Sequence, residues 1–179
     1  MDRGPSAMII STVRECATML GVVLNAPAKA GDIAELLLRF PDLPRSLVGL
    51  YRAHDGERMS GERIGLFHGY WFNSVRQLLD EVAAWDQVRR DIPDDVEGPP
   101  SYPPRMVKQL VHAPRWVPFA SAGRIHIALD LEPDELGQMG QVINFGADDL
   151  AHYQIAQSFE AFLTDMHARY VSGGGTHRW

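Results

Sequence analysis

The stretch from residue 116 to residue 163 constrains the fold of this chain more than any other part. Within it, residues 124–131 alternate apolar residues with other types. Ile125 and Ile127 fall on one face of an extended chain, and His126 and Asp130 fall on the other, because successive side chains of a strand point to opposite faces. This alternation predicts a half-buried β-strand. The neighbouring strands that the sequence predicts are residues 116–120, 141–145 and 153–156.

A loop of hairpin composition, residues 132–140, joins two of these predicted strands. Pro118 interrupts the first strand, and proline within a strand predicts an edge position or a bulge. Ser158 follows the last strand and is placed to cap a helix. Residues 64–72 add one or two short strands earlier in the chain.

Helical periodicity dominates the rest of the chain, with apolar residues recurring every three or four positions. The predicted helices lie in residues 9–23, 32–40, 44–56, 75–85 and 158–170. Asp32 stands near the start of the second, where a carboxylate can cap free amides. Gly56 is placed to end the third in a left-handed conformation. The pair His54 and Asp55 before it is expected to be structural, because a helix C-terminus favours histidine and a turn favours aspartate.

Length and composition limit the class of protein. A chain of 179 residues suits one domain. Its net charge of -6 and isoelectric point near 5.6 argue against nucleic-acid binding, which requires a basic patch. No apolar run reaches the roughly 20 residues that span a membrane. Cys16, the single cysteine, is expected to be a buried apolar residue, and the lack of a disulfide framework favours a reducing compartment.

A secretion signal is the alternative for the first apolar segment. Residues 16–24 are apolar and are followed by Ala28-Lys29-Ala30, which resembles a small-residue cleavage site. Acidic Asp2 and Glu15 precede or begin the run, and its spacing is helical. We therefore expect a folded helix and a cytoplasmic protein.

Residues 89–109 form a proline-rich, acidic segment that is expected to be a surface loop with little burial, and the segment most prone to disorder. Long loops often carry binding residues.

No motif for catalysis, for a cofactor or for a metal is present. None of the seven histidines belongs to an HExxH motif, and Gly-x-Ser-x-Gly is absent. The acidic residues 130–135 lack the glycine of a calcium loop. His126 and Asp130 lie four strand residues, roughly 13 Å, apart and cannot be direct partners. The sequence therefore predicts no catalytic residue, no cofactor and no metal ligand.

Three segments together resemble the SUKH superfamily, the domain of fungal Smi/Knr cell-wall-synthesis regulators and of many bacterial immunity proteins. Residues 33–56 are similar to its leading helix, Leu-Pro step and glycine-ended helix, and residues 64–85 to its short strands and following helix. Residues 116–163 are similar to its Trp-x-Pro-Phe-Ala, Leu-Asp-Leu, Gly-Gln-Val-Ile and Ser-Phe-x-x-Phe-Leu elements. The positions that match these motifs are expected to determine the fold, and they are Trp116, Pro118, Phe119, Asp130 and Phe159.

The resemblance implies an α+β fold, a single mixed, largely antiparallel β-sheet flanked by N- and C-terminal helices, without enzyme activity. The domain organisation that follows is an N-terminal helical extension in residues 1–30 packed on the domain, a SUKH-like domain in residues 31–171 and a flexible tail in residues 172–179.

The resemblance also implies a protein partner. Our first hypothesis is a bacterial immunity protein, monomeric or weakly dimeric, that neutralises a cognate toxin such as a nuclease by direct binding. Acidic loop residues would contact a basic partner, because charge complementarity speeds association. The hypothesised contacts are Asp94, Asp95, Glu97, Glu132, Asp134 and Glu135. The alternatives are a regulatory or scaffold module of the cell-wall-regulator type, and an enzyme whose site gathers distant residues such as His54, His126 and Asp130.

Overall fold

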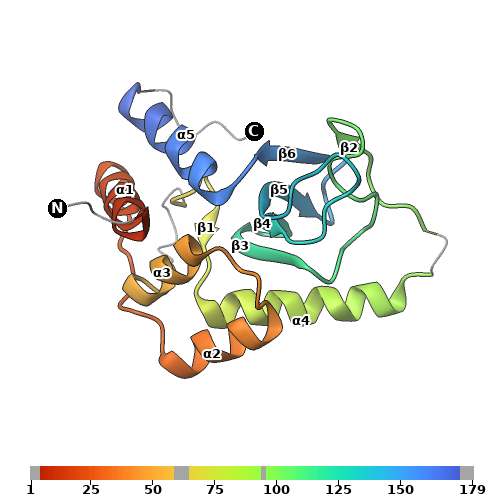
Figure 1. Cartoon of the computed structure of the whole chain (residues 1–179), viewed down its shortest axis with the longest axis horizontal. Coiled ribbons are helices and arrows are strands. Elements are labelled where there is room, and N and C mark those ends of the chain that lie inside the picture. The colour runs from red at the N-terminus through yellow and green to blue at the C-terminus, as the bar shows by residue number, and fades with distance from the viewer. Residues whose placement is uncertain (1–4, 59–64, 94–95, 174–179) are drawn as a thin grey trace.

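A computed structural model describes residues 5–58, 65–93 and 96–173. Helices and one six-stranded sheet make up this part of the chain (Figure 1). The helices are α1 (Pro5–Leu20), α2 (Ala30–Arg39), α3 (Arg45–Ala53), α4 (Val75–Asp91) and α5 (Phe159–Val171). The strands are β1 (Trp71–Phe72), β2 (Ser101–Tyr102), β3 (Trp116–Ala122), β4 (Ile125–Asp130), β5 (Gln141–Gly146) and β6 (His152–Ala156).

The strand order in the sheet is β1-β3-β4-β5-β6-β2. All neighbouring pairs are antiparallel except β2 and β6, which are parallel. The expected mixed, largely antiparallel sheet between N- and C-terminal helices is thereby confirmed. The register of β3 shifts between Pro118 and Ala120, so the proline marks a bulge in an inner strand.

The main core lies on one face of this sheet. Figure 1 shows α1, α3 and α5 gathered at the β1 side, with α4 running beneath the strands. Buried phenylalanines join these layers: Phe67 meets Phe119 edge-to-face at 5.5 Å, and Phe119 meets Phe159 at 5.3 Å. Edge-to-face packing adds to the burial of large apolar area. This core therefore ties the N-terminal helices to the last strands and helix.

Helix α1 belongs to this main core. Ile9, Val13 and Cys16 are buried in it. Burial raises the pKa of the Cys16 thiol to about 11, so the side chain behaves as a small apolar residue, as expected. The helix ends at Leu20, earlier than predicted, because Gly21 takes a φ of 65°. The division of the chain at residue 30 stays a prediction.

The helix caps differ in part from those predicted. Ser158 caps α5 as expected, since its side chain accepts a hydrogen bond from the backbone of Ala161 at 3.1 Å. The prediction for Asp32 was wrong: the N-cap of α2 is Lys29, without a side-chain bond, and Asp32 pairs with Arg76 at 2.8 Å. Its position in the first turn still complements the helix dipole.

The prediction that Gly56 ends helix α3 was also wrong, although its left-handed conformation was predicted correctly. Helix α3 ends at Ala53 with His54 as its C-cap, before the glycine is reached. Gly56 does have a φ of 75°, but its role is a close approach between chain segments. A Cβ there would lie 2.5 Å from the backbone nitrogen of Ser74 and 2.7 Å from the carbonyl oxygen of Phe72. Only glycine fits where the chain passes this near.

The segment predicted as a surface loop, residues 89–109, is exposed over most of its described length, although its first residues, 89–91, belong to α4 and two later residues are buried. Val107 is fully buried, and Ser101 Oγ accepts hydrogen bonds from the backbone of Met106 and Val107 at 3.2 and 3.0 Å. Tyr102 of β2 stacks on Tyr153 of β6 at 5.7 Å. The expectation of a surface segment with little burial therefore holds for most of residues 89–109. Ser101 and Val107 are the exceptions among the described residues of this range, because the pairing of β2 with β6 packs this part of the chain against the sheet.

Some predicted features lie outside the described residues. These are Asp94, Asp95, Ile64 and the end of the predicted tail, residues 174–179. Of the strands predicted in residues 64–72, the structure has β1 and a turn that bridges Phe67 and Tyr70.

Replacement of Gly56 by alanine is expected to lower the free energy of unfolding by about 2–4 kcal/mol, since the added methyl group combines backbone strain with a clash against fixed backbone. Gly31→Ala is the matched control, because a Cβ at this position of α2 meets nothing within 4 Å. It should stabilise the protein by about 0.5 kcal/mol through helix propensity. Urea unfolding followed by circular dichroism measures both. Equal stability of the two variants would show that the close approach at Gly56 is not restrictive.

Candidate functional site

A second, smaller core covers the other face of the sheet. Its buried residues come from α4, from the segment before β3 and from three strands. They are Trp85, Val107, Ala113, Trp116, Ala128, Ile143 and Phe145. Phe145 is at its centre, with ring centroids 5.3 Å from both Trp85 and Trp116. The face of β4 that the alternation assigned to His126 and Asp130 is therefore as buried as the apolar face.

His126 is hydrogen-bonded through both ring nitrogens in this second core. Trp85 Nε1, which can only donate, lies 3.0 Å from His126 Nε2, so Nε2 is the acceptor. Burial lowers the pKa of His126 to about 4, and the ring is neutral at pH 7. The proton of the neutral ring is therefore on Nδ1, which donates to Ser121 Oγ at 2.9 Å. Asn73 Nδ2 donates to the same hydroxyl oxygen at 2.8 Å.

This arrangement differs from a catalytic serine–histidine pair. A general base must present an unprotonated nitrogen to the hydroxyl that it activates. The nitrogen of His126 that faces Ser121 carries the proton, and the other is occupied by Trp85. The network satisfies buried polar groups and holds the second core together.

The residues suggested for a non-local enzyme site have separate hydrogen-bond partners. Asp130 is fully buried and accepts from Gln141 Nε2 at 2.9 Å. Burial raises the pKa of Asp130, and the bond from Gln141 opposes this. His54 bonds to Arg14 Nε at 2.9 Å and to the carbonyl oxygen of Asn25 at 3.0 Å. These bonds tie His54 to residues near the N-terminus, so the structure does not bring it together with His126 and Asp130.

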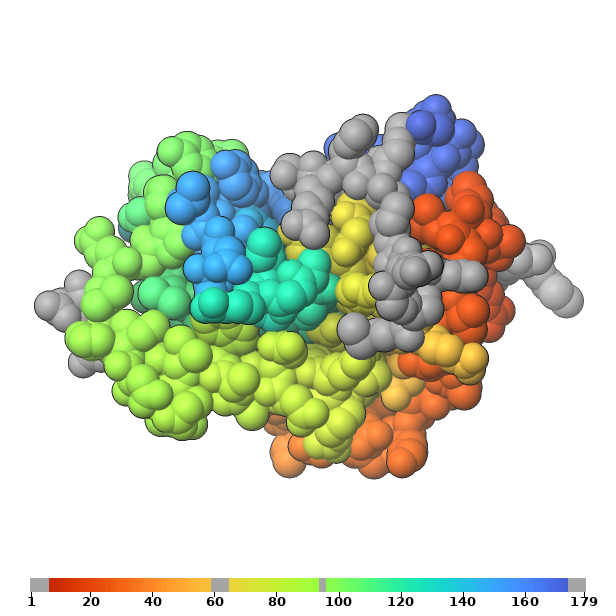
Figure 2. Space-filling model, turned by 180° about the vertical axis from the view of Figure 1, so that it is seen from behind, coloured from red at the N-terminus to blue at the C-terminus, as the bar shows by residue number. Residues whose placement is uncertain are grey.

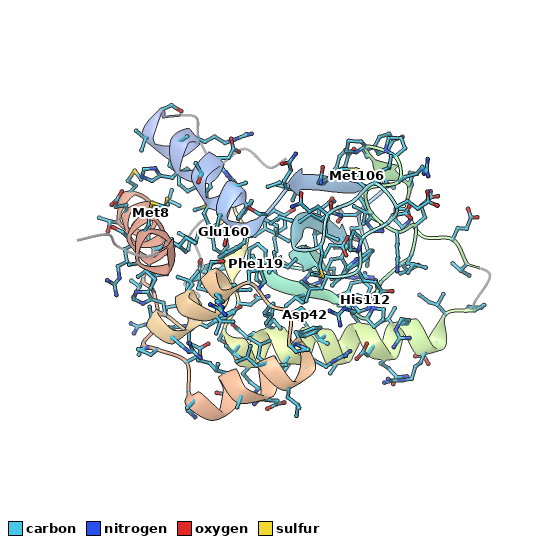
Figure 3. All side chains as sticks on the ribbon, in the orientation of Figure 1. Met8, Asp42, Met106, His112, Phe119 and Glu160 are labelled. Atoms are coloured by element: carbon cyan, nitrogen blue, oxygen red, sulfur yellow. The ribbon has the colours of Figure 1, made fainter. Side chains whose placement is uncertain are left out.

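His112 is a buried residue beside the second core whose two ring nitrogens both lack partners within the described part of the chain. Its side chain lies between α4 and the sheet (Figure 3), stacked on Trp85 with ring centroids 5.6 Å apart. Neither ring nitrogen has a hydrogen-bond partner among the described residues, and burial lowers the pKa of His112 to about 4.

Two hollows open beside the second core along α4. The larger has a volume of about 490 Å³ and the smaller about 270 Å³, and they adjoin at Val111. Residues that line the larger hollow are Glu81, Ala84, Trp85, Val88, Val111, Gly123, Arg124, His126 and Ala147. Residues that line the smaller hollow are Arg89, Ile92, Pro93, Val96, Leu110, Val111, His112 and Pro114. On the surface in Figure 2, yellow-green α4 lies beside the turquoise β3–β4 region.

Apolar side chains at these hollows are exposed. Val88 is 39% exposed, Val96 45% and Leu110 39%. The sequence prediction ended the helical stripe at Trp85, whereas α4 continues to Asp91. The signal that could have revealed the hollows is the continuation of the stripe as Val88 and Ile92.

The acidic residues expected to contact a partner differ in whether they already form ion pairs within the protein. Glu132 forms an ion pair with Lys108 at 2.5 Å, and Glu135 forms one with Arg105. The backbone of Asp134 donates to the carbonyl of Met106. Glu97 is exposed. The β4–β5 hairpin is thus attached to the segment around β2, and its role in partner binding stays a prediction.

No three histidine, cysteine or acidic side chains in the part of the chain that the structure describes are placed to hold a metal ion. None of the described helices is long and apolar enough to cross a membrane.

Comparison with known families gives a match over most of the chain. A model of the SMI1 / KNR4 family (SUKH-1) matches residues 27–165. This range contains every strand, both hollows and the helices α2, α3 and α4.

Fungal regulators are among the similar curated proteins. The cell wall biosynthesis/cell cycle regulator smi1 of Schizosaccharomyces pombe is 30% identical over 133 residues, which cover 68% of this chain and 26% of that protein. The cell wall assembly regulator SMI1 of Saccharomyces cerevisiae is 25% identical over 183 residues, covering 80% of this chain and 35% of that protein. The chain therefore spans about a quarter to a third of the length of these relatives.

His112 and His126 are expected to respond oppositely to replacement by phenylalanine. At pH 7, His112→Phe should raise the free energy of unfolding by about 1–2 kcal/mol, because it removes a buried polar group without partners. His126→Phe should lower it by about 2–3 kcal/mol, because the Trp85 N–H and Ser121 lose their partner. Urea unfolding at pH 7 measures both, and the same sign for both would contradict these assignments.

The lowered pKa values of His112 and His126 also predict that the free energy of unfolding depends on pH. Their folded pKa of about 4 lies below the ordinary value of 6.5, so the unfolded chain binds more protons between these values. Stability should therefore fall as the pH falls from 6.5 towards 4, by up to about 1.4 kcal/mol per pH unit for each histidine. Each phenylalanine variant should show a shallower slope than the wild-type protein in urea unfolding at pH 6.5, 5.5 and 4.5.

Proposed function

The chain belongs to the SMI1 / KNR4 family (SUKH-1), and from this premise we propose that it is a regulatory module that acts by binding another protein at the hollows beside α4. The process in which we place it is cell-wall synthesis, since the fission-yeast and budding-yeast relatives are named regulators of cell-wall biosynthesis and assembly. The compartment expected for this role is the cytoplasm.

The observation that carries the proposal is the exposure of apolar side chains around a preformed concavity. The larger hollow has a volume of about 490 Å³, within the range of roughly 300–1,000 Å³ typical of binding pockets. Val88, Val96 and Leu110 line the two hollows and keep more than a third of their surface in water. Clustered apolar exposure of this kind marks interaction sites.

The proposed role is non-enzymatic. Its support is the pairing of His126 beside the larger hollow: His126 has no free nitrogen, and its partner Ser121 accepts two hydrogen bonds. Groups that are held in this way stabilise the fold rather than exchange protons with a substrate.

Neutralisation of a toxin is the second candidate. Its support is the acidic balance of the chain, with a net charge of -6. We rank it below the regulatory role, because the similar curated proteins are named regulators and two of the hypothesised contacts, Glu132 and Glu135, already pair with Lys108 and Arg105.

Val88→Asp is expected to abolish partner binding, because it places a charge among the apolar lining residues of the larger hollow. Leu150→Asp is the matched control: this leucine is 91% exposed and lines neither hollow. Affinity purification of each tagged variant from the cells of origin, followed by quantitative mass spectrometry, compares them. Partners retained by the wild-type protein and Leu150→Asp should be depleted at least tenfold with Val88→Asp.

The identity of the depleted proteins separates the two candidates. Factors of cell-wall synthesis support the regulatory role, and a secreted toxin encoded beside the gene supports neutralisation. Equal recovery with both variants would show that the hollows are not the binding surface.

A further inference from the structure

We propose that the larger hollow recognises a short segment of the partner that places an apolar side chain over Trp85 and a carboxylate beside it on Arg124. This inference rests on the proposed function, since it specifies the chemistry of the partner at the same surface.

The apolar part of the site is formed by small and branched side chains. Ala84, Val88, Val111 and Ala147 line the hollow, and Trp85, a residue that is 8% exposed, lines it as well. Trp85 is held in place by its bond to His126 and by its contact with Phe145. A rigid aromatic side chain beside aliphatic ones suits a single apolar anchor of a partner, because such anchors contribute most of the binding energy of an interface.

The charged part is Arg124, in the turn between β3 and β4. Its side chain is exposed and lines the hollow. No ion pair joins Arg124 to an acidic side chain within the described ranges. By contrast, Arg89 pairs with Asp86 at 3.5 Å, and Arg90 donates to Gln87 at 2.7 Å. Arg124 is thus the cation beside this hollow that is available for an external carboxylate, which arginine binds well.

Glu81 gives the site a direction. It lies on the α4 side, with Oε2 3.8 Å from His126 Nε2, while Arg124 lies on the side of the β3–β4 turn. A carboxylate of the partner would be repelled on the first side and attracted on the second. The acidic residue of the partner must therefore lie on the side of the apolar anchor that faces the β3–β4 turn.

The extent of the site limits the length of the motif. Glu81, Ala84, Trp85 and Val88 are spaced as one face of α4 and span about 10 Å at 1.5 Å per residue. A segment of two helical turns or of a few extended residues covers this length. The partner is therefore recognised through a short linear motif in which an apolar residue and an acidic residue are close together.

Selection from a displayed library of random 12-residue peptides on the full chain tests the proposal. Wild-type protein should enrich peptides with aspartate or glutamate within four residues of a leucine, phenylalanine or tryptophan. Arg124→Glu should remove this preference, weaken the selected peptides about three- to tenfold and favour lysine or arginine near the anchor. The matched control, Arg90→Glu, makes the same change of charge on α4 outside both hollows and should leave selection and affinity unchanged.

The outcomes separate this proposal from the proposed function. Three results would overturn the recognition of a carboxylate. The wild-type protein could enrich peptides without acidic residues, Arg124→Glu and Arg90→Glu could have equal effects, or the wild-type protein could enrich no peptides beyond those that Val88→Asp enriches. The proposed function fails separately, when the cellular partners persist with Val88→Asp. If Val88→Asp removes the cellular partners but Arg124→Glu leaves peptide selection unchanged, the hollow is the binding surface and its preference for a carboxylate is rejected.

Discussion

Burial of strand β4 on both faces is the constraint on which the rest of the structure depends. Ile127 and Leu129 lie in the main core, whereas Ala128 lies in the second core on the opposite face. A strand of this kind needs a covering layer on each side. Helices α1, α3 and α5 provide one, and the end of α4 with the segment before β3 provides the other. Buried His126 and Asp130 are accommodated because each is hydrogen-bonded.

The hollows follow from the way α4 serves both cores. Val75, Leu78 and Val82 pack in the main core, and Trp85 packs in the second. Beyond Trp85 the same face of the helix continues as Val88 and Ile92, which line the hollows instead of filling a core. The candidate binding surface is thus the C-terminal half of an amphipathic helix together with the β3–β4 turn, adjacent to residues that are rigidly packed. A rigid base of this kind favours specific recognition, because little order has to be created on binding.

Local charge and total charge point to different partners. The net charge of -6 suggested a cationic partner, contacted by acidic loops. In the structure, Glu132 and Glu135 pair with Lys108 and Arg105, while Arg124 stands at the larger hollow. A binding site responds to the charges within a Debye length of roughly 10 Å, so the arrangement at the hollow outweighs the sum over the chain.

The sequence by itself determined the elements whose signal is local. Alternation predicted β4, helical spacing predicted the buried faces of α1 to α5, and Ser158 was correctly assigned as a cap because a cap bonds within one turn. Fold class was accessible because the family motifs sit in these same elements. Only the tertiary structure decided the pairing of β2 with β6, the close approach at Gly56 and the burial of Val107, since their partners are far along the chain. The hollows belong to this second group: the helical stripe of α4 does continue as Val88, but the concavity also requires the segment around Val111 and the β3–β4 turn, which are remote in sequence from α4.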